Sequence, residues 1–357
     1  LQMFGSVGWL FAVVDRIASS VSATEWELYQ KQRNGESERI DTHPLLDLWA
    51  KPNQFYTNQE FVEVSVQHFE LAGEMWWLVL RNAVGQPVEL WPVRPDRMTP
   101  VPNRDAYIAG YVYQIGAERI PLAVEDMIFI RRPSPIDPYR GIGFIGSILS
   151  TIATEQEASQ WTAQFFRNNA EPGGIIEFSE DLDDPSFDRF VARFKAQHQG
   201  VQNAHRVAII ERGKWVERTY TNRDIQLEQL RRLDRDLILG ARGMPASALG
   251  ISEDVNRANA EAGQFTLSQN ILLPVLRRIQ GEINQTLCPM FGEGLMFKFV
   301  DPTPENRELD LREATEGYKA GLLTRDEART RLNETPAIEG GDEFYVAPTP
   351  LGLLGLP

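Results

Sequence analysis

Apolar residues along the first 130 positions recur at two different spacings. A spacing of three or four residues indicates amphipathic helices, and strict alternation indicates half-buried strands. Thr57 followed by Glu60 has the form of a capping box, which marks the start of a helix. Gly85 lies between two strongly apolar runs, as in a β-hairpin. The expected elements are a helix and a strand within residues 9–30, a short helix at 42–49, a helix from 57 to 69, paired strands at 75–81 and 88–91, and strands at 107–115 and 127–131.

Helical spacing dominates from Ile142 onward and stops near Arg167, where a proline and two glycines follow. Residues 252–262 carry few large apolar side chains, so we expect a loop there. A long helix at 263–287 should follow it, kinked at Pro274 because proline removes one backbone hydrogen bond. The other expected elements are strands at 174–178, 206–210 and 214–220, a helix that starts at Pro185, a helix at 224–240 with Ile225, Leu230, Leu233 and Leu237 on one side, and terminal helices at 305–319 and 324–333.

Composition narrows the class of protein. The 357 residues are 42% hydrophobic, which excludes wholesale disorder and favours about two domains. Cys288 is the only cysteine, so an intramolecular disulfide and a multi-thiolate metal site are excluded, as is typical of intracellular proteins. The longest apolar stretches fall short of the roughly 18 to 20 residues of a membrane helix, so no membrane association is expected.

The charge balance indicates how the protein would interact with nucleic acid. Fifty Asp and Glu residues outnumber 36 Lys and Arg residues, for a formal net charge of −14. Tight binding to phosphates draws on basic clusters that release counterions, so a DNA-gripping surface is disfavoured. An acidic wall still lets DNA slide past without sticking.

One glycine motif raises an enzymatic alternative. Residues Gly141 to Gly146 match G-x-G-x-x-G, the dinucleotide fingerprint. That fingerprint follows a strand directly, whereas three prolines precede it here, so we interpret it as a turn that leads into a helix. A nucleotide-dependent enzyme that uses this cluster remains an alternative. No Walker A, G-x-S-x-G or H-E-x-x-H motif occurs, and we expect no enzyme activity, catalytic residue, metal ligand or cofactor.

Six blocks of residues, taken in order, carry a resemblance to a known family. The blocks are His43-Pro44-Leu45 with Lys51-Pro52-Asn53; Val88 to Arg97; Phe165-Phe166 with Asn169-Ala170 and Pro172-Gly173-Gly174; Gly243-Met244-Pro245-Ala246 with Leu249-Gly250; Asn259-Ala260-Glu261 with Leu272, Pro274, Leu276, Ile279 and Asn284; and Gly321 to Thr324 with Glu327-Ala328-Arg329 and Gly340-Gly341-Asp342. In this order they resemble the portal (head–tail connector) proteins of tailed double-stranded DNA bacteriophages, and the resemblance spans roughly residues 10 to 345. One departure is Gly141 to Phe144, where that family often has a Ser-Pro pair.

The resemblance implies an α+β portal-like fold and a division into named regions. Portal subunits form a ring of twelve around a channel, and each has a wing, a stem, a clip and a crown. The implied regions are the N-terminal wing at 1–140, stem helix 1 at 141–168, the clip at 169–222, stem helix 2 at 223–249, the tunnel loop at 250–262, a kinked long helix returning to the wing at 263–302, the crown at 303–345 and a flexible tail at 346–357.

The resemblance also implies a function and its partners. The chain would be a structural channel for DNA packaging and ejection at one capsid vertex, within the virion and, during assembly, in the host cytoplasm. Its partners would be eleven copies of itself, the major capsid protein, the terminase large subunit, a head–tail connector or adaptor, and double-stranded DNA passing through. Another minor virion component is the alternative within this class.

Two groups of residues are the candidate sites under this interpretation. The resemblance places the tunnel loop nearest to DNA. Charged residues on the two stem helices could pair across subunits, line the channel or simply face water. The tunnel-loop candidates are Glu253, Asp254, Asn256, Arg257 and Asn259, and the stem candidates are Glu155, Glu157, Arg231, Arg232 and Arg235.

Overall fold

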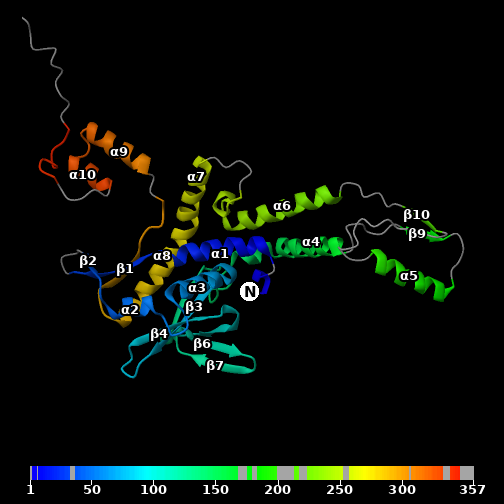
Figure 1. Ribbon diagram of the computed structural model, residues 1–357. Coiled ribbons are helices and arrows are strands. Elements are labelled where there is room, and N and C mark those ends of the chain that lie inside the picture. The colour runs from blue at the N-terminus through cyan, green and yellow to red at the C-terminus, as the bar shows by residue number, and fades with distance from the viewer. Residues whose placement is uncertain are drawn as a thin grey trace, which may run out of the picture. The chain divides into compact units, whose positions relative to one another are not determined.

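The computed structural model divides the chain into two compact units, Leu1–Pro302 and Thr303–Pro357. Its helices and strands are labelled in Figure 1. The mixture of helices and sheets agrees with the α+β expectation. The strand expected at 206–210 and the end of that expected at 214–220 lie outside the described residues, which are 2–5, 7–32, 37–167, 175–178, 183–198, 213–216, 223–251, 257–304, 307–332 and 338–345.

The first sheet joins segments that are far apart in the sequence. Its antiparallel order is β11-β1-β2, with β1 at Trp26–Lys31, β2 at Ser37–Ile40 and β11 at Leu295–Phe299. Leu28 of β1 lies opposite Phe297 of β11, and both side chains are fully buried. Neither β2 nor β11 was expected from the sequence.

A side chain fastens β11 to the helix before it. The side-chain Oδ1 of Asn284 accepts a hydrogen bond of 2.7 Å from the Phe297 backbone N–H, and its Nδ2 donates one of 3.0 Å to the Phe297 carbonyl. The amide therefore pairs with β11 as the backbone of a neighbouring strand would. Both the N–H and the carbonyl of the buried Phe297 thereby gain a hydrogen-bond partner.

Two further antiparallel sheets follow in chain order. The order β4-β3-β8 joins β3 (Glu74–Arg81), β4 (Pro87–Val93) and β8 (Met127–Arg131), and the expected hairpin around Gly85 is confirmed. The order β5-β6-β7 joins β5 (Met98–Asn103), β6 (Tyr107–Ile115) and β7 (Glu118–Leu122). Short 3-10 turns connect them: η2 (Pro95–Arg97) and η3 (Val124–Asp126).

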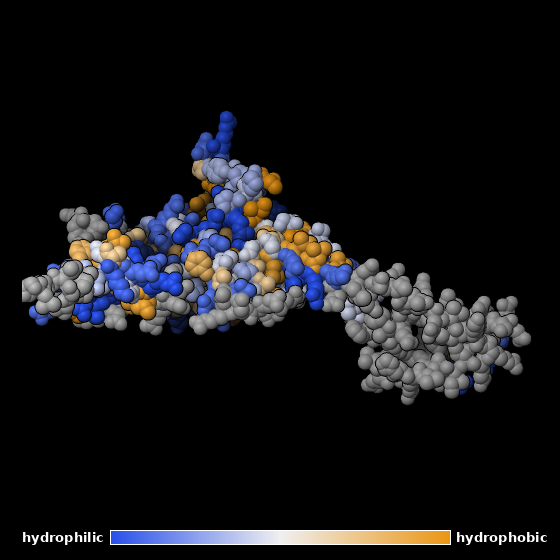
Figure 2. Space-filling model, turned by 90° about the horizontal axis from the view of Figure 1, so that it is seen from above, coloured by the Kyte–Doolittle hydropathy of each residue, from blue (hydrophilic) through white to orange (hydrophobic). Residues whose placement is uncertain are grey.

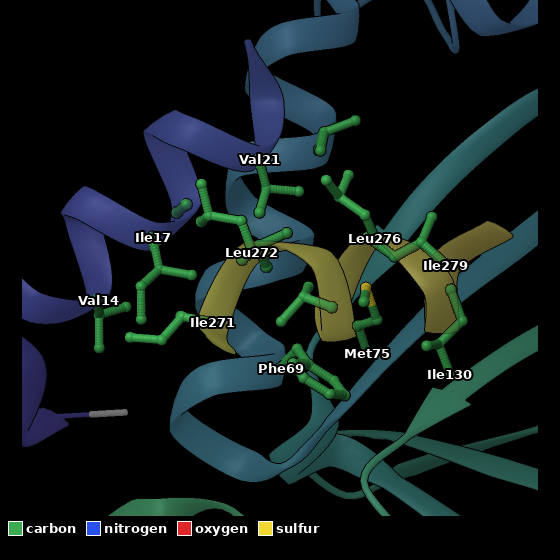
Figure 3. Packing of buried hydrophobic residues seen from close by; sticks show 14 of the residues in the cluster. Val14, Ile17, Val21, Phe69, Met75, Ile130, Ile271, Leu272, Leu276 and Ile279 are labelled. Atoms are coloured by element: carbon green, nitrogen blue, oxygen red, sulfur yellow. The ribbon is translucent and has the colours of Figure 1, made fainter. Parts of the chain in front are cut away.

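Helices cover the first of these sheets and form the main core. The helices are α1 (Gly8–Ser22), α2 (Pro44–Ala50) and α3 (Asn58–Ala72), and the Thr57–Glu60 capping box at the start of α3 is confirmed. Figure 3 shows Ile17 of α1, Phe69 of α3, Met75 of β3 and Leu276 of a later helix within one cluster of buried hydrophobic side chains. Each is at most 1% exposed, and burying such a side chain contributes about 1.5 to 3 kcal/mol.

The long helix near the C-terminal side of this unit begins earlier than expected. It comprises α7 (Arg257–Leu267), the π turn η7 (Ser268–Leu272), α8 (Leu273–Glu282) and the π turn η8 (Ile283–Leu287). The loop expected at 252–262 is therefore wrong from Arg257 onward. Alanines and Glu261 are strong helix formers that need no large apolar neighbours. The predicted disturbance at Pro274 takes the form of η7, because a π turn accommodates the carbonyl that proline leaves without a donor.

Two helices flank the insert in the sequence. They are α4 (Leu149–Arg167), entered through the 3-10 turn η4 (Phe144–Ile148), and α6 (Arg223–Arg242), which lie side by side in Figure 1. In the insert, β9 (Ile175–Phe178) pairs antiparallel with β10 (Gly213–Val216), and α5 spans Asp184–His198. The remaining short helices of this unit are η1 (Gln2–Gly5), η6 (Ala246–Leu249) and η9 (Cys288–Met290).

The second unit contains α9 (Arg307–Lys319) and α10 (Arg325–Arg331). Thr324 and Glu327 form a capping box at the start of α10. The Asp326 backbone N–H donates a 2.7 Å hydrogen bond to the Gly341 carbonyl, which ties the segment after α10 back to its first turn.

Candidate subunit-interface and channel residues

An ion pair with a buried carboxylate joins the two flanking helices within one chain. Arg231 of α6 donates a 2.9 Å hydrogen bond to the Glu155 carboxylate of α4, whose side chain is 5% exposed. Ser159, one turn further along α4, donates to the same carboxylate at 3.2 Å. Two of the stem candidates are therefore brought together, but in the same subunit.

Of the other three stem candidates, two lie at the surface, whereas the Arg235 side chain is only 16% exposed. Glu157 and Arg232 are exposed on α4 and α6. Arg235 bonds the neighbouring Asp236 at 2.8 Å and places its guanidinium 6.0 Å from the centre of the Trp9 ring, a cation–π contact with α1. Whether any of them pairs across subunits stays a prediction.

The apolar side of α6 faces away from the rest of the described chain. Leu230, Leu233 and Leu237 are 37%, 55% and 46% exposed, and we call them the leucine stripe. In the view of Figure 2, hydrophobic residues gather on the surface over α6. The inward side of α6 instead carries Ile238 together with the carboxyl of Asp234. Periodicity identified the stripe but not the direction in which it points.

The exposed face of α4 is also partly apolar. Leu149 and Trp161 are 48% and 45% exposed, and the residues between them on this face, such as Ala153 and Thr154, are small. Single exposed apolar residues are ordinary, but two adjacent helices that each expose several are typical of a surface that another protein covers.

The tunnel-loop candidates are only partly placed. Glu253, Asp254 and Asn256 lie outside the described residues. Arg257 and Asn259 stand in the first turn of α7 rather than in a loop, and Asn259 is exposed. Their proximity to DNA stays a prediction.

The glycine motif has a packing role. A Cβ atom on Gly141 would lie 2.1 Å from the Gly73 carbonyl oxygen, and one on Gly143 would lie 2.6 Å from the Leu71 carbonyl oxygen. The Gly141 N–H already donates a 2.9 Å hydrogen bond to Glu74. The glycines therefore let two backbones touch, and the space that a phosphate would need beside them is filled. This geometry argues against the nucleotide-dependent alternative.

A second buried carboxylate, which sequence reasoning missed, holds three elements together. Glu70 of α3 is fully buried, and Arg242 of α6 contacts it with two hydrogen bonds of 2.5 and 2.9 Å. Arg132, just after β8, reaches the same carboxylate at 3.4 Å and lies over the Phe69 ring. Burial lowers the pKa of the Arg132 guanidinium, an effect that Glu70 opposes. The only sequence signal was an acidic residue at an apolar position of a helix.

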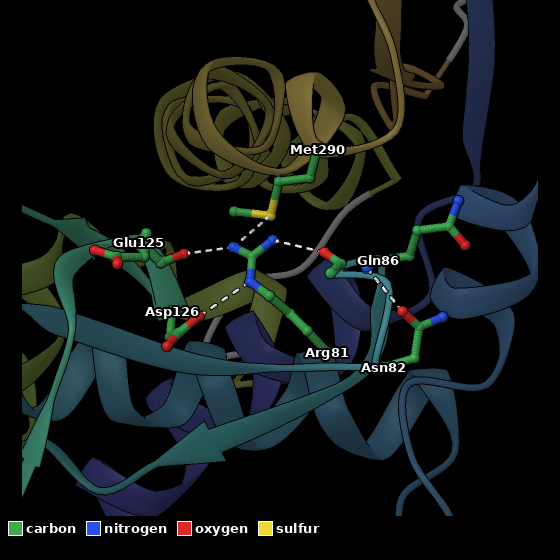
Figure 4. A network of polar contacts seen from close by, with 7 residues as sticks. Arg81, Asn82, Gln86, Glu125, Asp126 and Met290 are labelled. Atoms are coloured by element: carbon green, nitrogen blue, oxygen red, sulfur yellow. Dashed lines mark hydrogen bonds and ion pairs between the residues drawn. The ribbon is translucent and has the colours of Figure 1, made fainter.

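A third polar network, centred on Arg81, closes the hairpin of β3 and β4 (Figure 4). Its guanidinium donates to Asp126 at 3.0 Å, to the Glu125 carbonyl at 2.7 Å and to the Gly85 carbonyl at 3.2 Å. A 3.5 Å contact to the Met290 sulfur adds the segment after α8. The sheet, its turn and the segment that follows the long helix are thus held in one arrangement.

The described residues contain neither a group of three or more His, Cys, Asp or Glu side chains that could hold a metal ion nor a helix long and apolar enough to cross a membrane. Burial raises the pKa of the Cys288 thiol to about 11, so this sulfur stays protonated and is a poor nucleophile.

Comparison with known proteins gives consistent results. The chain is similar to the portal protein of Enterobacteria phage HK97, with 23% identity over 375 residues that cover 97% of this chain and 84% of that protein. Its fold is similar to a chain in the neck of an empty gene transfer agent (GTA) particle, with a TM-score of 0.73, 24% identity and coverage of 93% and 92% of the two chains. A chain in the neck of the native particle, computed with C12 symmetry, gives a TM-score of 0.70, 23% identity and coverage of 93% and 91%. The family model for the phage portal protein matches residues 9–333, and the chain therefore belongs to the phage portal protein family, whose members are structural proteins.

Proposed function

We propose that this chain assembles into a ring of twelve around a channel through which double-stranded DNA is packaged and ejected. The observation that carries the proposal is the uncovered leucine stripe on α6, next to an α4 face that is also partly apolar. A ring needs two different surfaces that fit each other, because each subunit contacts one neighbour with one face and the other neighbour with the opposite face. The C12 symmetry of the similar GTA neck supports twelve as the number.

The exposed faces of α4 and α6 complement each other in apolar character and in charge. We propose that the leucine stripe of one copy packs on the Leu149–Trp161 face of α4 in the next copy. Glu157 on that face and Arg232 beside the stripe carry opposite charges, which would favour the correct register. Arg231 and Glu155 would then brace each subunit internally rather than join two subunits.

The net charge of the chain indicates how the channel would interact with DNA. Each copy contributes a net charge of −14, so a ring repels phosphates overall and lets DNA slide in both directions. In this proposal Glu253, Asp254, Asn256, Arg257 and Asn259 come closest to DNA. The insert of residues 169–222 would dock the terminase large subunit and later a head–tail connector, and the wing would meet the major capsid protein.

Replacing Leu233 with aspartate tests the ring. Burying a carboxylate against apolar side chains costs several kcal/mol, so the fraction of protein in rings should fall by more than about tenfold. Native mass spectrometry and electron-microscope class averages of the full chain measure this fraction. The matched control is Val84→Asp, at an exposed turn of the β3–β4 hairpin, which should leave the ring intact.

Two outcomes would count against the proposal in different ways. A wild-type protein that stays monomeric at all concentrations would contradict the ring. Rings of unchanged abundance in the Leu233→Asp variant would leave the ring standing and remove the leucine stripe as its interface.

A further inference from the structure

We propose that Arg132, directly after β8, is the receptor of an oxyanion-binding site that takes a carboxylate or phosphate group from outside the chain. The inference starts from the cluster around Glu70, in which two guanidinium groups share one buried carboxylate. One positive charge is therefore in excess, although the side chains of Arg132 and Arg242 are only 24% and 12% exposed. A largely desolvated charge without a counterion of its own is unfavourable, and a further anion would remove this cost.

The two arginines do not share the Glu70 carboxylate equally. Arg242 binds both oxygens, at 2.5 Å from Nε and 2.9 Å from Nη2. Arg132 reaches the same oxygens through Nη2 at 3.4 and 3.5 Å, beyond the usual length of a charge-assisted hydrogen bond. The Nε and Nη1 atoms of Arg132 have no hydrogen-bond partner among the described residues, and the protein does not enclose them completely. Arg132 therefore has donors available for another acceptor.

The backbone and an aromatic ring hold Arg132 in place. Its N–H donates a 2.7 Å hydrogen bond to the Gly73 carbonyl, and its carbonyl accepts one of 3.0 Å from the Ile142 N–H. Its guanidinium lies over the Phe69 ring, 5.0 Å from the ring centre. A guanidinium that lies over a ring can still bind an acceptor with the N–H groups at its edge. A receptor group that is already positioned loses less entropy when its ligand binds.

The neighbouring elements add positive rather than negative charge. Glu70 is the ion-pair partner of Arg132 within the described part of the chain, whereas Glu74, the next buried acid in the sequence, is paired with Arg140. The helix α8 packs on β8 and contributes Arg278, which is exposed. Burial lowers the pKa of the Arg132 guanidinium against the effect of Glu70, and the charge of Arg278 lowers it further. An incoming anion would therefore meet a field that favours it.

The geometry of a guanidinium selects the class of ligand. Its N–H groups form pairs that match two oxygens of a carboxylate or phosphate, whereas chloride offers a single acceptor. Two sources can supply such a group: free phosphate in solution, or a carboxylate of a second copy of this chain, which carries 50 Asp and Glu residues. The site itself lies within one chain, and the second source alone rests on the proposed ring.

Calorimetric titration of the full chain with inorganic phosphate, at constant pH and ionic strength, tests the first source. Arg132→Gln should weaken the affinity at least about tenfold, because charged hydrogen bonds are lost. Arg132→Lys should lie in between, since lysine keeps the charge but not the paired N–H groups. Both variants should still fold, because Arg242 continues to neutralise Glu70. The matched control is Arg104→Gln, which removes an exposed arginine between β5 and β6 and should leave the affinity unchanged.

Native mass spectrometry of the same variants tests the second source. If a carboxylate of the next copy occupies the site, Arg132→Gln should lower the fraction of protein in rings several-fold, and added phosphate should lower it in the wild type. If free phosphate is the ligand, the ring fraction should not change while the calorimetric difference remains. Equal or absent phosphate binding in the wild type and Arg132→Gln, together with an unchanged ring fraction, would overturn the site. A wild type without rings would contradict the proposed function, and the phosphate titration alone would then decide the site.

Discussion

Replacing Glu70 with glutamine should lower the free energy of unfolding by about 3 to 5 kcal/mol. The Glu70 side chain is fully buried and bonds Arg242 and Arg132, which come from different parts of the chain. Glutamine keeps the shape but leaves two largely buried guanidinium groups without a countercharge. Because Glu70 joins α3, α6 and the end of β8, its loss should loosen the attachment of α6 to the rest of the unit. Denaturant unfolding of the full chain measures the change.

The matched control for this substitution is Glu63→Gln, two turns earlier on the same helix. Glu63 is partly exposed and has no ion pair within the described part of the chain, so its replacement should change stability by less than about 0.5 kcal/mol. Equal effects of the two substitutions would show that Glu70 is not the centre of the cluster.

Replacing Gly73 with alanine should destabilise the protein by about 3 kcal/mol or more. Gly73 ends α3 with φ of +79°, in the left-handed region that favours glycine. A Cβ atom there would lie 2.1 Å from the backbone carbon of Ile142, so the α3–β3 turn and the segment that leads into α4 would have to separate. Two costs therefore add: the strained backbone and the forced movement of a second backbone.

The substitution Gly85→Ala measures the backbone cost without the close approach of a second backbone. Its φ is +84°, but no atom lies within 4 Å of the position that a Cβ atom would take, so Gly85→Ala carries the backbone cost alone, about 1 kcal/mol. Thermal unfolding of both variants measures the difference. If both variants lost the same stability, the close approach of the two backbones would not matter energetically.

Local signals predicted much of the first unit. The capping box at Thr57, the hairpin at Gly85 and the strand at 107–115 depend on hydrogen bonds and turn geometry between residues close in sequence. Such signals can be recognised in a single sequence because the residues that form each hydrogen bond or turn lie within the same short segment.

Most of the missed features depend on residues that are distant in the sequence. β11 is a strand because Leu28 and Asn284 lie beside it, and nothing within Leu295–Phe299 distinguishes it from a buried loop. The start of α7 was missed because its helix-forming residues are small and polar. Glu70 was unremarkable until the fold placed Arg132 and Arg242 around it.

By itself the sequence determined the α+β class, most element positions and, through six ordered blocks, the resemblance to portal proteins, because these depend on local periodicity and on the identity of residues. Only the tertiary structure decided the orientation of α6, which buries Asp234 and exposes the leucine stripe. Periodicity shows which residues share a helix face, whereas the packing of the whole chain decides which face is covered. For the same reason only the structure shows that Arg231 pairs with Glu155 within one chain, and pairing of the stem candidates across subunits stays a prediction.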